Sequence, residues 1–256
     1  MKNAMLKSLY LSGALLAYCG QGAFAQVSMT LTGVNEGYVM GGVYTSPYSI
    51  TANGTPMLLI CDDFTFDIPS IPYAWTAGTT SFASLDGETT ASTSVRFDQS
   101  SPTQQVADYA TAAVLAAELM ALPSYYSEAA GEYSYAIWGV FDPTLLTSNP
   151  ASGVGSLTPG ELSAAQGDLA AAKALVAGAT NASGVVNLSS ISIDGNPLEG
   201  LTIYTPLVPP GPNSQEFLSV SVAEPPSPAL LGADLLALAG LILIARRRLA
   251  SSVKLT

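Results

Sequence analysis

The chain of 256 residues contains no histidine. This absence excludes catalytic triads and Cys–His dyads that use histidine as a base, and it excludes histidine-ligated metal sites. Cysteine is nearly absent too, with only Cys19 and Cys61. Because Cys19 falls in the N-terminal leader described below, Cys61 is alone in the mature chain. We therefore expect no intramolecular disulfide.

Basic residues are scarce, with eight Lys and Arg against 19 Asp and Glu. Six of the eight lie near the two ends of the chain, at Lys2, Lys7, Arg246, Arg247, Arg248 and Lys254. Residues 26–228 keep only Arg96 and Lys173 against 18 acids, a formal charge of −16. Phosphate binding requires clustered Lys and Arg, so this charge excludes a nucleic-acid partner. It favours divalent cations and basic partners, and it is typical of secreted bacterial surface proteins.

The N-terminus has the three parts of a secretory signal peptide. They are a basic start, a short apolar segment and a small-residue cleavage site, at Lys2 and Lys7, Leu9 to Ala17, and Ala23-Phe24-Ala25. We expect residues 1–25 to be removed, so that the mature chain starts at Gln26. The alternative, lipidation at Cys19, is disfavoured because Tyr18 stands where a small residue is expected.

The C-terminal segment has an apolar run between a proline-containing turn and a basic cluster. The run Ala229 to Ala245 is interrupted only by Asp234, and Arg246-Arg247-Arg248 follows it. As a helix it is about 25 Å long, at the short limit for spanning a bilayer. The arginines favour retention on the cytoplasmic side, so residues 249–256 are expected to be a cytoplasmic tail. The alternative, a buried helix of a soluble domain, does not explain three consecutive arginines.

This order resembles the PEP-CTERM sorting signal of Gram-negative bacteria that make exopolysaccharide. Glu224 and Pro225 match the family's Pro-Glu-Pro motif, while Ala223 replaces its first proline. The resemblance implies that residues 223–248 are recognised by an exosortase, a membrane cysteine protease that processes the tail near this motif. The membrane helix, residues 229–245, would then be temporary.

The body begins with segments that favour strands. Residues 27–32 alternate apolar and polar side chains, and residues 38–40, 43–44 and 57–61 are short apolar runs between Gly and Pro breakers. Residues 64–84 are expected to stay extended, and residues 86–101 to form a polar loop. Strands are expected again at 185–188, 191–193, 201–204 and 217–222, with a turn at Asp194-Gly195-Asn196.

Three helices are predicted between these two groups of strands. Residues 103–122 repeat apolar side chains with helical spacing, which favours an amphipathic helix. A second helix is expected from Glu128 to Phe141. A third opens with the capping box Thr158-Pro159-Gly160-Glu161 and ends near Gly178. The expected class is α+β: a β-sandwich or barrel-like sheet domain over residues 26–222 with an inserted three-helix layer, plus one C-terminal transmembrane helix.

Part of the body, residues 58–142, more distantly resembles the thioester domain of Gram-positive surface adhesins. There a Cys in a Cys-Ile-Asp-like strand bonds to the Gln of a Thr-Gln-x-Ala-Ile-Trp motif, and the thioester captures host nucleophiles. Cys61-Asp62-Asp63 and Ala136-Ile137-Trp138 carry the resemblance. Ser134 stands at the position of the Gln, and serine has no carboxamide to condense with a thiol. Gln104 and Gln105 are the remaining candidates, outside the family's pattern.

Other chemistry at these residues has weaker signals. Cys61 is either a possible reactive thiol or a buried core residue. Asp62, Asp63 and Asp67 are weak Ca²⁺ candidates, because no Asp-x-Asp-x-Asp-Gly loop is present. Otherwise they are strand-end acids that face solvent or cap nearby backbone. A carboxylate pair for glycoside hydrolysis cannot be picked out among the acids. Trp138 is expected in the core and Trp75 at the surface.

The leading interpretation is an exported, non-enzymatic surface or exopolysaccharide-matrix protein, structural or adhesive, that exosortase sorts. Its expected partners are exosortase, the secretion machinery, exopolysaccharide and, before processing, the membrane; no cofactor is expected. The alternatives are a thioester-like adhesin that uses Cys61, a secreted glycan hydrolase, and a single-pass protein whose tail is never removed.

Overall fold

The computed structural model describes residues 26–34, 38–64, 71–86, 94–97, 101–147, 153–207 and 215–223. These ranges include most of the domain expected at residues 26–222. The leader, the apolar run and the arginine cluster lie outside the described residues. Among the residues that are described, no helix combines the length and the apolar character needed to cross a membrane.

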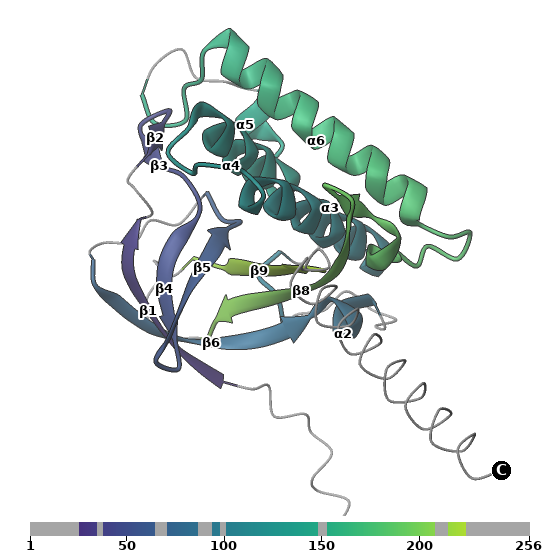
Figure 1. Cartoon of the computed structure of the whole chain (residues 1–256), viewed down its shortest axis with the longest axis horizontal. Helices are drawn as coiled ribbons and strands as arrows, with labels where there is room; N and C mark the ends of the chain where they lie inside the picture. The colour runs from purple at the N-terminus through teal and green to yellow at the C-terminus, as the bar shows by residue number, and fades with distance from the viewer. Residues whose placement is uncertain are drawn as a thin grey trace, which may run out of the picture.

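Six strands close into an antiparallel barrel (Figure 1). They are β1 (Gln26–Val34), β4 (Tyr48–Ala52), β5 (Thr55–Cys61), β6 (Tyr73–Ser81), β8 (Asn196–Pro206) and β9 (Phe217–Val222). Their order is β6-β1-β4-β5-β9-β8, and β6 pairs with β8 to close the circle. Closure gives both edge strands a partner, which removes the exposed edges of an open sheet. The last two strands of the barrel therefore come from the far end of the chain.

Short hairpins extend this sheet. The two-residue turn Asn53-Gly54 joins β4 to β5. A second two-residue turn, Asp194-Gly195, joins β7 (Ser192–Ile193) to β8. All four turn residues have positive φ, the left-handed backbone conformation. Asn, Asp and Gly tolerate positive φ, so they favour the turns that match strand twist. The turn predicted at Asp194-Gly195 is confirmed. A separate pair, β2 (Val39–Met40) and β3 (Val43–Tyr44), lies beside the barrel.

The barrel interior is one hydrophobic core. Its buried members are Met29, Leu31, Tyr48, Ile50, Leu59, Cys61, Trp75, Ala77 and Phe217. Trp75 is only 5% exposed and stacks on Phe217, with ring centroids 5.6 Å apart. The prediction of a surface Trp75 is therefore wrong. Its immediate neighbours are small or polar, but alternate residues of β6 point into the barrel, and Trp75 is one of them.

Three long helices form the other layer: α3 (Pro102–Met120), α4 (Glu128–Phe141) and α6 (Pro159–Ala179). Ser101, Ser127 and Thr158 cap their first turns, and the capping box predicted at Thr158 and Glu161 is present. The short helices α2 (Phe82–Asp86), α5 (Thr144–Thr147) and η1 (Leu188–Ser190) complete the fold.

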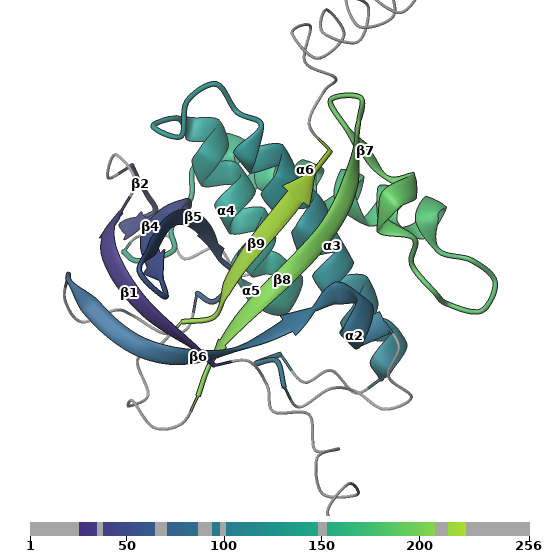
Figure 2. The ribbon, with the colours of Figure 1, turned by 60° about the horizontal axis from the view of Figure 1, so that its bottom comes forward.

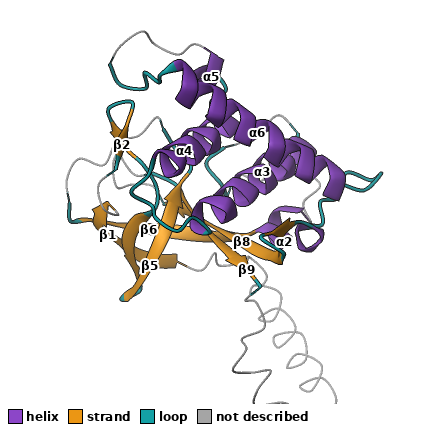
Figure 3. Ribbon diagram, turned by 45° about the horizontal axis from the view of Figure 1, so that its top comes forward, coloured by secondary structure: helices purple, strands orange, loops and turns teal. Residues whose placement is uncertain are grey.

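Helix α3 lies at the centre of the molecule, between the barrel and the other helices (Figure 2). It was expected to be amphipathic, but it is buried on nearly all sides. Its many alanines let α4 and α6 pack against it while β8 and β9 cover another face. Helix α6 is the outermost layer, with only Ala165, Ala172 and Val176 buried. Figure 3 shows the helices gathered on one side of the strands.

The structure confirms the α+β class and decides for a barrel rather than a sandwich. All three predicted helices are present with nearly the expected bounds. The strand expected at residues 185–188 is wrong, because only an isolated bridge at Val186 and the start of η1 occur there. The end of the stretch expected to be extended, from Phe82, forms α2.

Candidate functional site

Residues that the sequence singles out meet at the end of β5. The Trp138 indole Nε1 donates a hydrogen bond to the Cys61 carbonyl at 3.0 Å, although 77 residues separate them. The Cys61 N–H donates to Ser46 Oγ at 3.0 Å, and the Ser46 N–H donates to Ser134 Oγ at 3.0 Å. The strand and helix segments that carry the thioester-domain resemblance are therefore neighbours in space.

The Cys61 thiol belongs to the barrel interior. Its side chain is fully buried, and Sγ donates to the Asp63 carbonyl at 3.2 Å. Burial, followed by the negative charges of Asp63 and Asp62, raises the pKa of the thiol well above its ordinary value. A protonated thiol without solvent access is a poor nucleophile. Cys61 is thus a core residue in this state of the molecule.

No glutamine stands where the thioester motif has one, but one carboxamide lies near the thiol. Gln215 Nε2 donates to the Asp63 carbonyl at 3.2 Å, the same oxygen that accepts from Cys61 Sγ. The candidates named from sequence have other partners: Gln104 Nε2 donates to Asp108 Oδ1, and Gln105 Nε2 to the Phe97 carbonyl. Gln215 was missed because it lies just before β9, outside the segment that resembles the thioester domain.

Ser134, at the position of the family's glutamine, links α4 to the barrel. Its hydroxyl donates to the Ala130 carbonyl at 2.8 Å and accepts from the Ser46 N–H. Both residues are buried. A serine hydroxyl is short enough for this contact and can accept and donate at once.

Replacing Ser134 with alanine is expected to lower the free energy of unfolding by about 1–3 kcal/mol, because the buried Ser46 N–H loses its acceptor. Thr111→Val in α3 is the matched control, since the Thr111 hydroxyl makes the same helical bond to a carbonyl four residues back and accepts no hydrogen bond from the described part of the chain. Urea unfolding of both variants measures the difference. Equal losses would show that the link to Ser46 adds no stability.

A buried polar cluster lies beside Cys61. Asp62, Asp63 and Glu216 are each at most 1% exposed, and Arg96 pairs with Asp63. Glu216 accepts hydrogen bonds from the Tyr109 hydroxyl at 2.5 Å, from the Arg96 N–H at 2.8 Å, and from Thr205 Oγ1. The cluster therefore links Asp62 and Asp63, which follow β5, to α3, to the 94–97 segment and to Glu216, which directly precedes β9.

Asp62 is the exception within this cluster, because among the described residues no N–H or O–H group donates to either of its carboxylate oxygens. Burial first, and then the charges of Glu216 and Asp63, raise the pKa of Asp62 well above its ordinary value. Burial also raises the pKa of Glu216, but its three donors oppose that shift. These three donors favour the ionised form of Glu216, whereas no such donor favours an ionised Asp62 within the described residues. Once protonated, Asp62 can itself donate to Glu216.

The weak Ca²⁺ candidates do not form a metal centre among the described residues. Asp62 and Asp63 are buried rather than facing solvent as the alternative expected, and Asp63 is already paired with Arg96. Asp67 lies outside the described residues. No group of three or more Cys, Asp or Glu side chains that could hold a metal ion occurs within the described ranges.

Asp62 and Glu216 are also the convergent carboxyl pair that the sequence could not pick out. Their burial leaves no room for a glycosidic bond between them, and neither lines the surface cavity described below. Glycoside hydrolysis needs two carboxyls on either side of a bound sugar. The pair is therefore a feature of the interior and not a substrate site.

Glu216, Arg96, Tyr109 and Thr205 were not singled out from the sequence. One signal did exist: Arg96 is one of only two cations in the body, and an isolated cation in so acidic a chain often neutralises buried acids. No periodic pattern marks the others.

The residues proposed for processing lie at or beyond the borders of the described chain. Gln26 is the first residue of β1, and Ala223 follows β9, its N–H donating to the Pro197 carbonyl at 2.9 Å. Ala23 and Ala25 precede the described residues. Glu224, Pro225 and Arg246 to Arg248 follow them.

Taken together, the described residues around Cys61 can stabilise the junction of barrel and helices, and none of them is an exposed nucleophile or base. Comparisons with protein-family models, with curated proteins and with solved structures found no match, so no family is shown for this chain.

Proposed function

We propose that this chain is an exported, non-enzymatic protein of the bacterial surface or exopolysaccharide matrix, with a structural or adhesive role. Its signal peptide directs export, and exosortase recognises residues 223–248, including the temporary membrane helix 229–245. The observation that carries the non-enzymatic part is the burial of Cys61, Asp62 and Glu216. The groups that would do chemistry are used inside the protein to hold barrel and helices together.

The sorting part of the proposal is supported by the order of signals in the sequence and by where the body ends. All the barrel strands lie between Gln26 and Val222, within the expected mature chain and before the Ala223-Glu224-Pro225 motif. A protease acting at Glu224 to Ser227 would therefore leave every strand of the barrel intact.

The intact mass of the protein recovered from the cell surface and culture medium tests this proposal. We expect a chain that starts at Gln26 and ends between Glu224 and Ser227, together with any added group. Changing Glu224 and Pro225 to alanine is expected to leave the tail in place. A native chain that retains Arg246 to Thr256 would instead be a permanent single-pass anchor, and the sorting proposal would fail.

A second function, a thioester-like adhesin, is favoured by one contact: Cys61 Sγ and Gln215 Nε2 both donate to the Asp63 carbonyl. Condensation would join the thiol sulfur to the Gln215 carboxamide carbon and release ammonia. The same mass spectrum tests it, because the bonded protein is lighter by one ammonia and Cys61→Ser abolishes the difference. We expect no such loss.

A further inference from the structure

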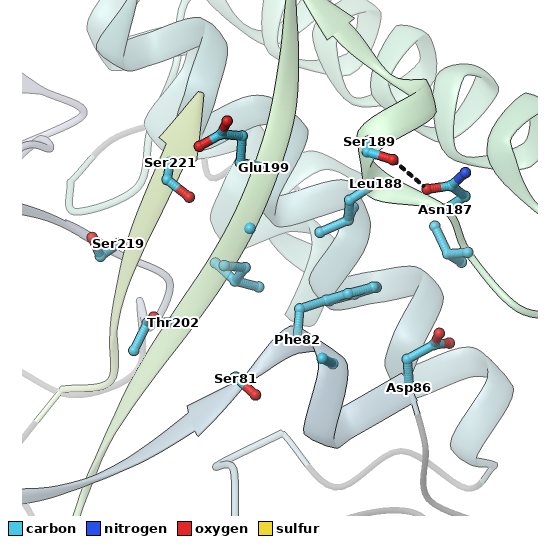
Figure 4. Close-up of a pocket in the computed structure, with 14 residues that line it drawn as sticks. Ser81, Phe82, Asp86, Asn187, Leu188, Ser189, Glu199, Thr202, Ser219 and Ser221 are labelled. Atoms are coloured by element: carbon cyan, nitrogen blue, oxygen red, sulfur yellow. Dashed lines mark hydrogen bonds between the residues drawn. The ribbon is translucent and has the colours of Figure 1, made fainter. Parts of the chain in front are cut away.

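A surface cavity of about 520 Å³ opens where the closing seam of the barrel ends (Figure 4). Strand β6 pairs with β8 only as far as Ser81 and Thr202, and β7 pairs with β8 only at Asn196 and Pro197. Between these points, residues 199–201 have no strand neighbour on that side within the described chain. Helix α2 and η1 close the gap instead. The cavity has the size of a small-molecule site.

Hydroxyl groups dominate the polar lining of this cavity. They come from three strands and from η1, at Ser81, Ser189, Thr202, Ser219 and Ser221, with the Asn187 amide beside them. Thr202 and Ser219 are cross-strand partners, and Ser221 lies opposite Gly200. Within the described residues, the hydroxyls of Thr202, Ser219 and Ser221 make no hydrogen bond to protein. They are available to a ligand that both donates and accepts.

The charge of the cavity has one sign. Asp86 and Glu199 contribute carboxylates, and Figure 4 shows them at opposite sides of the lining. Neither of the cations in the described body, Arg96 and Lys173, lines the cavity. A ligand that carries phosphate, sulfate or carboxylate would be repelled, whereas a protonated amine would be attracted.

Apolar side chains also line the cavity. They are Phe82, Val186, Leu188 and Leu201, and each is at most 7% exposed. A lining of both apolar side chains and hydroxyls suits a sugar ring, which has a C–H face and a hydroxyl edge. The Phe82 ring supplies the aromatic surface that such a face packs against.

We propose that this cavity binds an amine-bearing saccharide, a sugar unit with several hydroxyls and one protonated amino group. The inference rests on the proposed matrix role and names the ligand chemistry for it. A lysine side chain of a basic peptide would satisfy the carboxylates but would leave the hydroxyls unpaired. A neutral sugar would satisfy the hydroxyls but would leave the carboxylates without a counter-charge.

The test uses the full-length protein purified in a mild detergent and two oligosaccharides of equal length. One is a glucosamine oligomer with free amines, and the other is the same oligomer fully N-acetylated, which is neutral. Calorimetric titration is expected to show that the amine form binds at least about ten-fold more tightly, the effect of one charged hydrogen bond. Added salt should weaken only the amine form.

Variants locate the binding. Glu199→Gln is expected to reduce affinity for the amine oligomer about ten-fold, and Ser221→Trp, which fills the cavity from an exposed position, should abolish binding of both oligomers. Glu128→Gln removes an exposed carboxylate on α4 outside the cavity and should change nothing. Unchanged thermal unfolding of the variants shows that they fold.

Equal binding of the two oligomers, no binding of either, or binding that survives Ser221→Trp overturns the proposal. A lysine-rich peptide that binds more tightly than the amine oligomer and is lost in Ser221→Trp would assign the cavity to a basic protein partner instead. These results are independent of tail processing, so a failed sorting proposal and a failed cavity proposal are told apart.

Discussion

Replacing Arg96 with methionine is expected to lower the free energy of unfolding by about 3–5 kcal/mol. The Arg96 guanidinium pairs with Asp63, whose side chain is fully buried, while the Arg96 backbone N–H, which the substitution keeps, donates to Glu216. Methionine keeps much of the side-chain volume but removes the guanidinium that pairs with the buried Asp63 charge. The loss therefore measures the removal of this cation rather than a packing defect.

Urea unfolding at neutral pH measures this effect, and Lys173→Met is the matched control. Lys173 is the other cation of the body, and it is exposed on α6, so the same change of charge there should cost less than about 1 kcal/mol. The double variant Arg96→Met with Asp63→Asn should recover part of the lost free energy of unfolding, because asparagine removes the buried negative charge of Asp63. Equal effects of Arg96→Met and Lys173→Met would contradict the role assigned to Arg96.

Replacing Asp62 with asparagine is expected to increase the free energy of unfolding at pH 7 by on the order of 2 kcal/mol. Burial and the facing carboxylates of Glu216 and Asp63 raise the pKa of Asp62, so the folded state binds this proton more tightly than the unfolded chain. The proton's contribution to stability is complete below the ordinary pKa of aspartate, about 3.9. It is lost as the pH rises through the raised pKa of the folded state.

Unfolding measured between pH 4 and pH 8 checks both the sign and the residue. The wild-type protein should lose stability as the pH rises across this range, and Asp62→Asn should show a shallower slope, because its amide donates to Glu216 without needing a proton. Thr111→Val, which removes no titratable group, should leave the slope unchanged. An Asp62→Asn variant that is less stable at pH 7 and keeps the wild-type slope would mean that Asp62 is ionised and partnered.

The elements that could be predicted from sequence are those with local signals. The capping box at Thr158 and Glu161, the helix Glu128–Phe141 and the turn at Asp194-Gly195 each depend on a few consecutive residues, and all three are present. The burial of Trp138 also follows from its helical spacing beside Ile137. Trp75 was misplaced because its neighbours suggested a surface, while the barrel decided which face of β6 points inward.

At the candidate site too, local sequence signals did not predict the burial of the acids. Asp62 and Asp63 follow a strand, and nothing local reveals that α3 and the start of β9 cover them. Their partners Arg96 and Glu216 are 33 and more residues away along the chain, so only the closed barrel brings them together. The cavity between α2, η1 and β8 depends likewise on where the β6–β8 pairing stops.

Composition alone excludes histidine chemistry and gives the body its strongly acidic charge, and the periodicity of short segments predicts the α+β class. Three features could be learned only from the folded molecule: the strands close into a barrel, Cys61 is buried inside it, and Asp62 and Glu216 share a buried environment. These features depend on contacts between segments that are far apart in the chain. The free energy of such contacts cannot be read from the residues of any one short segment.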